Sequence, residues 1–300
     1  MDTPVDQPME STPEKPPIDY GDLAKKIMQS PAFIPAVVVL VGFLVAYWRF
    51  FSQLPTLWLG EDGYYSHGFL VPFIVGYILY RRWPTIKDTP VMPVAWIAIL
   101  LVPLFWLSYG ATLAGMKGIL SYTILATILV GIVFVAGWGW LKKTVLPTLY
   151  LAFAFPIWTG AINSYTNPLQ LTCTKISFHM LDILGLHPFR DESTTIYLGQ
   201  FVLDVGVPCS GLKLMLAILA FTCFFMLIGG LKWWGNLAMV ALIIPLCLFI
   251  NSLRIALIGI VGNEYGQKAG ATFHDYSGYI TLVLCFFILF KFARLLGWKD

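Results

Sequence analysis

Long apolar stretches, each followed by a short polar segment, set the pattern of this chain. Stretches of about 20 apolar residues are long enough to cross a bilayer as α-helices. The second stretch is short and the fifth contains Pro147 and Pro156, which leaves the count open by one. The pattern predicts an all-α fold, a polytopic transmembrane helical bundle of about eight spans. We place them at residues 32–50, 66–80, 93–111, 118–139, 144–162, 210–230, 234–257 and 276–296.

The longest connection between these spans, residues 163–208, has a pattern of its own. It opens with Asn163 to Pro168, a run typical of a turn and a helix start. Apolar residues then recur at helical spacing as far as Leu184, which predicts a small amphipathic helix on the membrane interface. Residues 194–198 and 201–205 are rich in β-formers around a glycine, which predicts a β-hairpin. We expect the two elements to cap the exterior end of the bundle; a simple interfacial plug is the alternative.

The composition agrees with a membrane protein. Hydrophobic residues make up 58% of the chain and charged residues 12%, and the mean hydropathy is +0.76. So little charge cannot cover a soluble globule of this length. Most lysines and arginines fall at the chain ends and in alternate connections, which the positive-inside rule makes cytoplasmic. Those residues are Lys25, Lys26, Arg81, Arg82, Lys87, Lys142, Lys143, Lys232, Lys291, Arg294 and Lys299.

This charge distribution fixes the expected orientation. Both termini are cytoplasmic in the cell (inner) membrane, and Cys209, Arg254 and His274 reach the exterior or periplasmic face. Residues 1–28 are rich in Pro, Asp and Glu, which predicts a disordered cytoplasmic tail. No basic segment leads into a short apolar core, so we expect an uncleaved first span rather than a signal peptide. Residues 29–300 then form one integral membrane domain.

Several function classes are disfavoured by what the chain lacks. The net charge of +3 comes with no basic patch of interleaved aromatics, so we expect no nucleic-acid partner. The cysteine spacing fits neither a zinc site nor a disulfide framework. No predicted helix carries His or carboxylate groups at metal-ligand spacing, so we expect no metal and no cofactor. Four cysteines are interpreted as apolar packing residues: Cys173, Cys223, Cys247 and Cys285.

Cys209 has a distinctive setting, at the start of an apolar span. Ser210 follows it and is predicted to N-cap the helix, which puts the thiol at a positive helix end that stabilises thiolates. Gly211 permits close approach of a substrate backbone, and Lys213 adds a positive charge on the same helical face. The alternative is a structural cysteine at a helix start.

Three further residues are predicted to join this thiol. Arg254 lies one helical turn after Asn251 in an otherwise apolar span, so the pair should face the bundle interior. The guanidinium could stabilise an oxyanion, or it could simply extend to the interface. His274 precedes the last predicted span and supplies the usual base for a thiol, with Asp275 or Asn251 as candidates to orient it. An interfacial histidine bonded to a loop carbonyl is the alternative.

At these residues the chain resembles the exosortase/archaeosortase family. The resemblance covers nearly everything after residue 35 and rests on several short runs in a fixed order. They are Asp62 to Pro72, which includes His67, then Phe153 to Pro156, Val207 to Lys213, Asn251 to Arg254, and the late His274. His67 is a candidate for binding substrate or bracing the site. Lys213 stands where many members carry arginine.

The resemblance implies a membrane-embedded cysteine protease or transpeptidase. Its substrates would be membrane-anchored proteins with a C-terminal sorting signal: a short motif, a transmembrane helix and a basic tail. Cys209 would form a thioester, with Arg254 and His274 as the other catalytic residues, and a lipid or glycan is a possible acceptor. Two rivals remain open, a polytopic transporter or channel and a non-catalytic membrane assembly factor. No convincing repeat relates the two halves, which disfavours the transporter.

Overall fold

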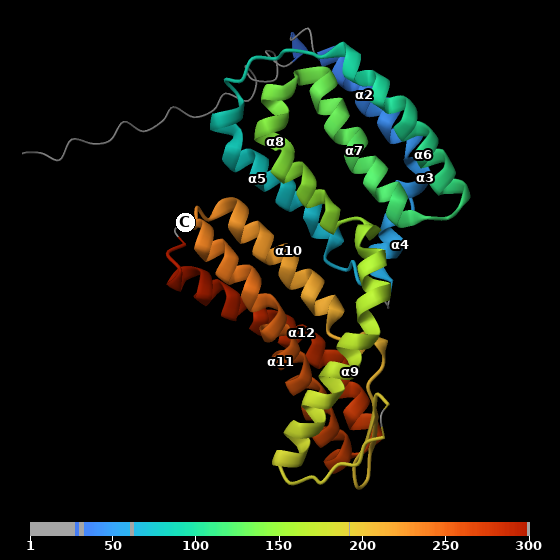
Figure 1. Ribbon diagram of the computed structural model, residues 1–300, viewed down its shortest axis with the longest axis vertical. Coiled ribbons are helices and arrows are strands. Elements are labelled where there is room, and N and C mark those ends of the chain that lie inside the picture. Colours follow the sequence, from blue (N-terminus) through green and yellow to red (C-terminus); the bar gives the residue numbers. More distant parts are fainter. Residues whose placement is uncertain (1–27, 30–32, 61–62, 192, 299–300) are drawn as a thin grey trace, which may run out of the picture.

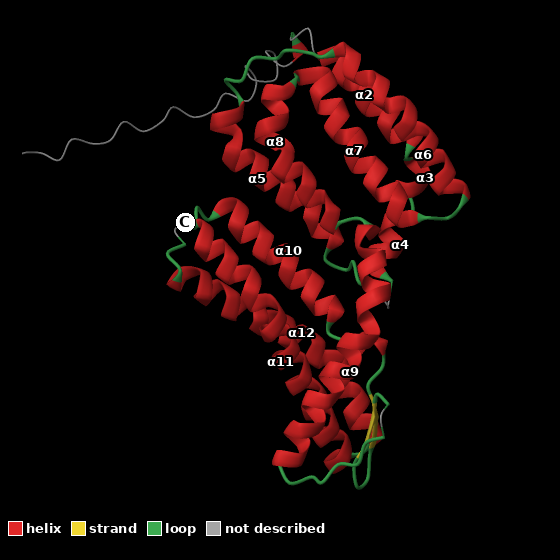
Figure 2. Cartoon of the chain, in the orientation of Figure 1, coloured by secondary structure: helices red, strands yellow, loops and turns green. Residues whose placement is uncertain are grey.

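The computed structural model describes residues 28–29, 33–60, 63–191 and 193–298. The tail predicted at residues 1–28 therefore lies almost entirely outside the described residues. The described chain is largely helical, with one small sheet (Figure 2). Its first half contains α2 (Phe33–Ala46), α3 (Trp48–Phe51), α4 (Leu54–Leu59), α5 (Val71–Ile86), α6 (Leu101–Leu113), α7 (Lys117–Ala136) and α8 (Trp138–Tyr150).

The second half builds the surroundings of Cys209. It contains α9 (Thr159–Ile183), β1 (Thr195–Tyr197), β2 (Val202–Asp204), α10 (Leu212–Ile228), α11 (Trp233–Tyr265) and α12 (Gln267–Leu295). Short 3₁₀ helices connect the longer elements: η1 (Gly68–Leu70), η2 (Ala95–Leu100), η3 (Leu151–Phe153), η4 (Pro156–Trp158) and η5 (Val207–Cys209).

The elements form a tilted helical bundle with an extension at one end. Helices α10, α11 and α12 pack side by side, and α9 packs along α11. Figure 1 shows α2 and α5 to α8 grouped at one end, while the far ends of α11 and α12 project at the other with α9 and the hairpin. At 33 and 29 residues, α11 and α12 are each longer than a bilayer core of about 30 Å requires. Helix α11 continues past residue 257, where the seventh predicted span ends, and α12 starts before residue 276, where the eighth begins.

Several apolar helices identify a multi-pass membrane protein. Four helical segments of the described chain are long and apolar enough to span: Ala95–Leu113, Lys117–Ala136, Trp233–Tyr265 and Gln267–Leu295. Two bent pairs raise the number to six if each is one span, and α10 is a shorter apolar helix of 17 residues. The count of eight stays a prediction.

Two predicted spans are not straight. The first bends by 64° between Phe33–Ala46 and Trp48–Leu59. The fifth bends by 70° between Trp138–Phe153 and Pro156–Ile183. The cause of the second bend is local, because Phe155 precedes a proline and is extended, with φ −110° and ψ 153°.

The connection after this bend is partly as predicted. The turn expected at Asn163 to Pro168 is wrong, because α9 begins at Thr159 and includes Pro168 in its interior. The apolar periodicity correctly predicted a helix that ends near Leu184. The polar residues from Asn163 to Asn167 led to a predicted start that is later than the observed one at Thr159. The hairpin is present: β1 and β2 are antiparallel, with Thr195 opposite Asp204 and Tyr197 opposite Val202. Its buried side packs on α9 and α11 through residues such as Ile196, Leu203 and Ile255.

Candidate active site

Cys209 ends the short 3₁₀ helix η5 and lies immediately before α10. Its amide donates to the Gly206 carbonyl at 2.9 Å, which closes the turn after β2. Gly211 then adopts the left-handed conformation, with φ +80°, and α10 starts at the next residue. The thiol is therefore held by a compact turn at a helix N-terminus, and Cys209 is buried.

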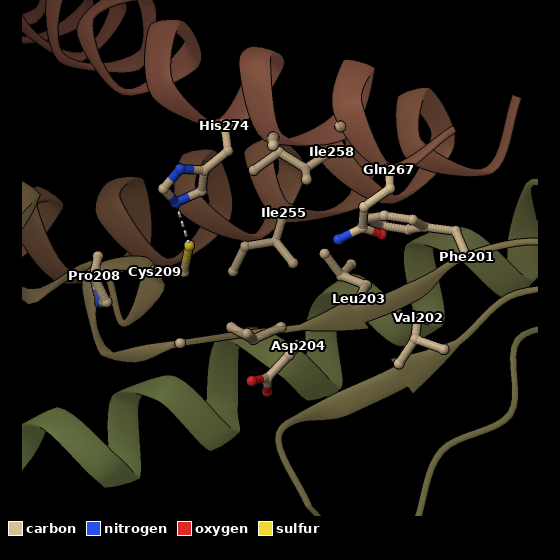
Figure 3. A pocket seen from close by; sticks show the side chains of 14 residues that line it. Phe201, Val202, Leu203, Asp204, Pro208, Cys209, Ile255, Ile258, Gln267 and His274 are labelled. Carbon is tan, nitrogen blue, oxygen red and sulfur yellow. Dashed lines mark hydrogen bonds between the residues drawn. The ribbon is translucent and has the colours of Figure 1, made fainter. Parts of the chain in front are cut away.

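The imidazole of His274 lies against this thiol. His274 Nε2 is 3.1 Å from Cys209 Sγ, although 65 residues separate the two in sequence. Figure 3 shows the imidazole of His274 directed at the Cys209 sulfur, with the contact drawn as a dashed line. This distance is within reach of direct proton transfer between a nucleophile and its base. His274 was predicted to precede the last span, and it lies instead in the second turn of α12.

The second nitrogen of His274 faces Asp275. Nδ1 lies 3.2 Å from Asp275 Oδ1, and a carboxylate at this position accepts the Nδ1 hydrogen. In that tautomer Nε2 carries a lone pair towards the thiol, as a general base requires. The Asp275 side chain is 76% exposed, so the contact orients the imidazole but contributes little to the stability of the fold. Of the two candidates to orient His274, Asp275 rather than Asn251 makes this contact.

Arg254 contacts the turn of α12 that carries His274. Its Nε donates to Ser277 Oγ at 3.0 Å, and its Nη2 donates to the His274 carbonyl at 3.1 Å. The Ser277 hydroxyl also donates to that carbonyl, at 3.2 Å. The guanidinium thus ties α11 to the backbone of the base rather than to the sulfur.

Asn251 supports the other partner of the pair. Its Nδ2 donates to the Cys209 carbonyl at 2.7 Å, and Asn251 is buried. The space beside Gly211, predicted to admit substrate, is taken by this amide, because a Cβ on Gly211 would lie 3.0 Å from Asn251 Nδ2. Asn251 and Arg254, one turn apart on α11, therefore hold the thiol and the base respectively.

Ser210 differs from its predicted role. Gly211 occupies the N-cap position of α10, and no side chain caps it. The Ser210 hydroxyl accepts from the Leu212 amide only at 3.4 Å, a long hydrogen bond. The left-handed turn at Gly211 shifts the helix start by one residue, which moved Ser210 out of the cap.

Sequence reasoning missed the support from α9. The Gln170 amide donates to the Val205 carbonyl, and the Cys173 thiol contacts the Ser210 carbonyl at 3.8 Å. Ser177 donates to the Ser252 carbonyl on α11 at 2.9 Å. Polar residues at helical spacing, Gln170, Cys173 and Ser177, were the available signal. Ser277 was also missed, although it lies three residues after His274 on the same side of α12.

Two predicted residues lie together at a different place. His67 precedes η1, and Lys213 lies close enough for its charge to act on the imidazole. His67 Nδ1 is buried without a hydrogen-bond partner among the described residues. His67 and Lys213 stay candidates for binding substrate or supporting the site.

A cavity of about 260 Å³ opens beside the sulfur. It runs along β2 and is also lined by α11 and α12, with Cys209 and His274 at one end (Figure 3). Its lining is mainly apolar, with Gln267 and Asp204 as polar additions. Within the described ranges, no group of three His, Cys, Asp or Glu side chains could hold a metal ion.

The sequence matches the family model of the transmembrane exosortases (Exosortase_EpsH) over residues 58–291. This range is well over half of the chain and includes Cys209, Arg254 and His274. Neither the curated proteins nor the solved structures gave a match. The chain belongs to the transmembrane exosortase family.

Proposed function

We propose that this protein is a cysteine protease or transpeptidase that cleaves the C-terminal sorting signal of exported, membrane-anchored proteins. The observation that carries the proposal is the 3.1 Å approach of His274 Nε2 to Cys209 Sγ. A thiol paired with an oriented imidazole, beside a cavity, is the arrangement that acyl transfer requires. Family membership agrees with a membrane peptidase or transpeptidase.

The reaction begins with transfer of the thiol proton to His274 Nε2. The Cys209 sulfur attacks a substrate carbonyl carbon, and its electrons move onto the oxygen. The tetrahedral intermediate collapses, the peptide C–N bond breaks, and His274 returns the proton to the leaving amine. The exported segment is left as a Cys209 thioester, while the transmembrane helix and basic tail depart into the bilayer.

The thioester then passes to an acceptor. His274 takes a proton from water, or from an acceptor amine or hydroxyl, as that group attacks the thioester carbon. The C–S bond breaks and the proton returns to the sulfur, which restores the enzyme. A lipid or a glycan is the acceptor class that fits a membrane-embedded site.

Arg254 acts as a positioning residue in this scheme. Its contacts with Ser277 and the His274 carbonyl fix the α12 backbone behind the imidazole. Two of the five guanidinium N–H groups are used there, so stabilisation of the oxyanion by the others is a second role to test. Asn251 positions the thiol through the Cys209 carbonyl.

The proposed location is the cell (inner) membrane, with both termini cytoplasmic and the site on the exterior face. The support is the placement of lysine and arginine, because Arg81 and Arg82 lie near the C-terminal end of α5 and Lys142 and Lys143 near the N-terminal end of α8. Figure 1 shows these two helix ends far from the start of α10. Residues 29–300 form the membrane domain in this proposal. The hairpin and α9 form an exterior cap over the cavity.

Substitution of the nucleophile tests the proposal. Cys209→Ser should abolish release of the substrate's C-terminal helix while membrane insertion and protein level stay unchanged. Cys223→Ser is the matched control, because Cys223 lies on α10 away from the site. Full processing by Cys209→Ser, with the other four cysteines also replaced, would exclude the thiol as nucleophile.

A further inference from the structure

Strand β2 leads directly to the sulfur. After Asp204 the chain needs only Val205 and Gly206 to reach η5, which ends at Cys209. The hairpin tip is fixed at the opposite end, where the Gln200 amide donates to Asn263 Oδ1 at 2.9 Å near the end of α11. The strand therefore runs from the C-terminal end of α11 towards the N-terminus of α10.

The hydrogen bonds of the hairpin identify which edge of β2 is open. The Leu198 amide donates to the Phe201 carbonyl, and the Val205 amide donates to the Thr194 carbonyl. Phe201 and Val205 thus face β1, and by the alternation of an antiparallel ladder Val202 and Asp204 face away from it. Within the described chain, no strand other than β1 pairs with β2.

The open edge contrasts with the outer edge of β1. There Tyr197 exchanges both backbone hydrogen bonds with Phe189, at 2.8 and 2.9 Å. The sheet is therefore closed at the outer edge of β1 and open along β2, although the Asp204 carbonyl already accepts from the Gly206 amide at 3.1 Å. An open edge presents amide and carbonyl groups that can pair with an extended chain.

The cavity beside the thiol lies along this open edge. Its walls include consecutive residues of β2, both the buried Leu203 and the exposed Val202 and Asp204. Lining by consecutive residues from both faces of the strand agrees with a cavity at the strand's edge. Ala271 of α12 also lines the cavity, as does Ile255 of α11, which lies between Leu203 and the α12 helix in Figure 3.

We infer that the substrate binds in this groove as an added strand on the open edge of β2, with the residues before the scissile bond lying along it. This inference rests on the proposed function and specifies how its substrate is recognised. Backbone pairing gives affinity that depends little on sequence, while the apolar lining selects apolar side chains at alternate positions.

The direction of the bound segment follows from the topology. An exported domain lies outside and its anchor lies in the bilayer, so the segment runs inward, as β2 does. The added strand is therefore parallel to β2, with the scissile carbonyl at Cys209. After cleavage the acyl portion stays paired with β2, which retains the thioester while the anchor leaves.

Peptide probes with methylated amides test this pairing. The probe is an acetylated tetrapeptidyl chloromethyl ketone made of alanine and leucine, used on the full-length enzyme in detergent. The Cys209 thiolate displaces chloride to form a C–S bond, and mass spectrometry follows the adduct. Backbone amides of the probe are methylated one at a time. Only alternate amides of an added strand face β2. Methylation at either the odd or the even positions of the probe should therefore slow labelling by roughly three- to tenfold, and methylation at the remaining positions should leave the rate unchanged.

A pair of enzyme variants provides a second readout. Ala271→Phe fills the groove beside β2, whereas Thr272→Phe is the matched control, since Thr272 lines a separate groove with Tyr265 and Tyr276. We expect Ala271→Phe to reduce peptide labelling at least tenfold while labelling by iodoacetamide, which needs no groove, stays unchanged. Thr272→Phe should leave both rates unchanged.

The outcomes separate this inference from the proposed function. If every methylated probe labels Cys209 at the rate of its parent, or if Ala271→Phe labels as fast as wild type, strand addition is wrong while the nucleophile stands. If labelling of Cys209 by the parent probe is no faster than labelling of Cys223, the proposed function itself is contradicted.

Discussion

Arg254 links α11 to the turn of α12 that carries His274, and Arg254→Lys tests what this link does. The arginine makes two hydrogen bonds there, to Ser277 Oγ at 3.0 Å and to the His274 carbonyl at 3.1 Å. A lysine keeps the charge but has one point-like ammonium in place of a planar fork. It can therefore replace at most one of the two contacts well.

The expected loss of rate follows from the one hydrogen bond that lysine cannot replace. One hydrogen bond from a charged donor contributes about 1.5–3 kcal/mol. Both contacts are only partly buried, so the lower value applies. A cost of about 1.5 kcal/mol on the active arrangement corresponds to roughly a tenfold loss of rate.

Two reactions distinguish positioning from oxyanion stabilisation. Alkylation of Cys209 by iodoacetamide passes through no oxyanion, whereas peptide processing does. If Arg254 positions His274, Arg254→Lys slows both reactions by about tenfold, and the effect is not additive with His274→Gln. If only processing is slowed, Arg254 acts on the oxyanion instead. Rates within twofold of wild type in both assays would refute the reasoning.

Substitutions at three positions test the surrounding packing, each by thermal unfolding in detergent. Gly211→Ala forces a Cβ into a left-handed turn, and we expect a loss of about 1–2 kcal/mol; an unchanged midpoint would contradict the observed φ of +80°. Asn251→Leu leaves the Cys209 carbonyl unpaired and should cost about 1–3 kcal/mol, whereas Asn251→Asp, whose carboxylate cannot donate as the amide does, should be no better tolerated. Gly262→Ala places a Cβ 2.5 Å from the Phe201 ring, so we expect about 1–3 kcal/mol of destabilisation and faster amide exchange in the hairpin; exchange at the wild-type rate would argue against this contact.

Periodicity predicted the elements that depend on local sequence. The hairpin at 194–198 and 201–205 contains β1 and β2, because β-branched residues around a glycine specify it locally. The spans at 118–139 and 210–230 correspond to α7 and α10. Family membership, expected from motifs around Cys209 and Arg254, is confirmed.

The missed features depend on tertiary context. Nothing local ends α11 at residue 257, and its last turns are stabilised by packing such as that of Gly262 against Phe201. The start of α9 depended on the extended Phe155, a backbone conformation that the proline after it imposes. Sequence could place Cys209 and His274 at one depth, but the contact between them required the packing of α12 against α10 and α11.

The most direct test of the central claim is the pH dependence of Cys209 alkylation by iodoacetamide. The protein carries replacements of Cys173, Cys223, Cys247 and Cys285, so that one thiol reports, and wild-type His274 is compared with His274→Gln. We predict that the wild type reacts at least tenfold faster at neutral pH and that the two rates converge at alkaline pH, where the thiol ionises without a base. Superimposable profiles would contradict the claim that His274 activates Cys209.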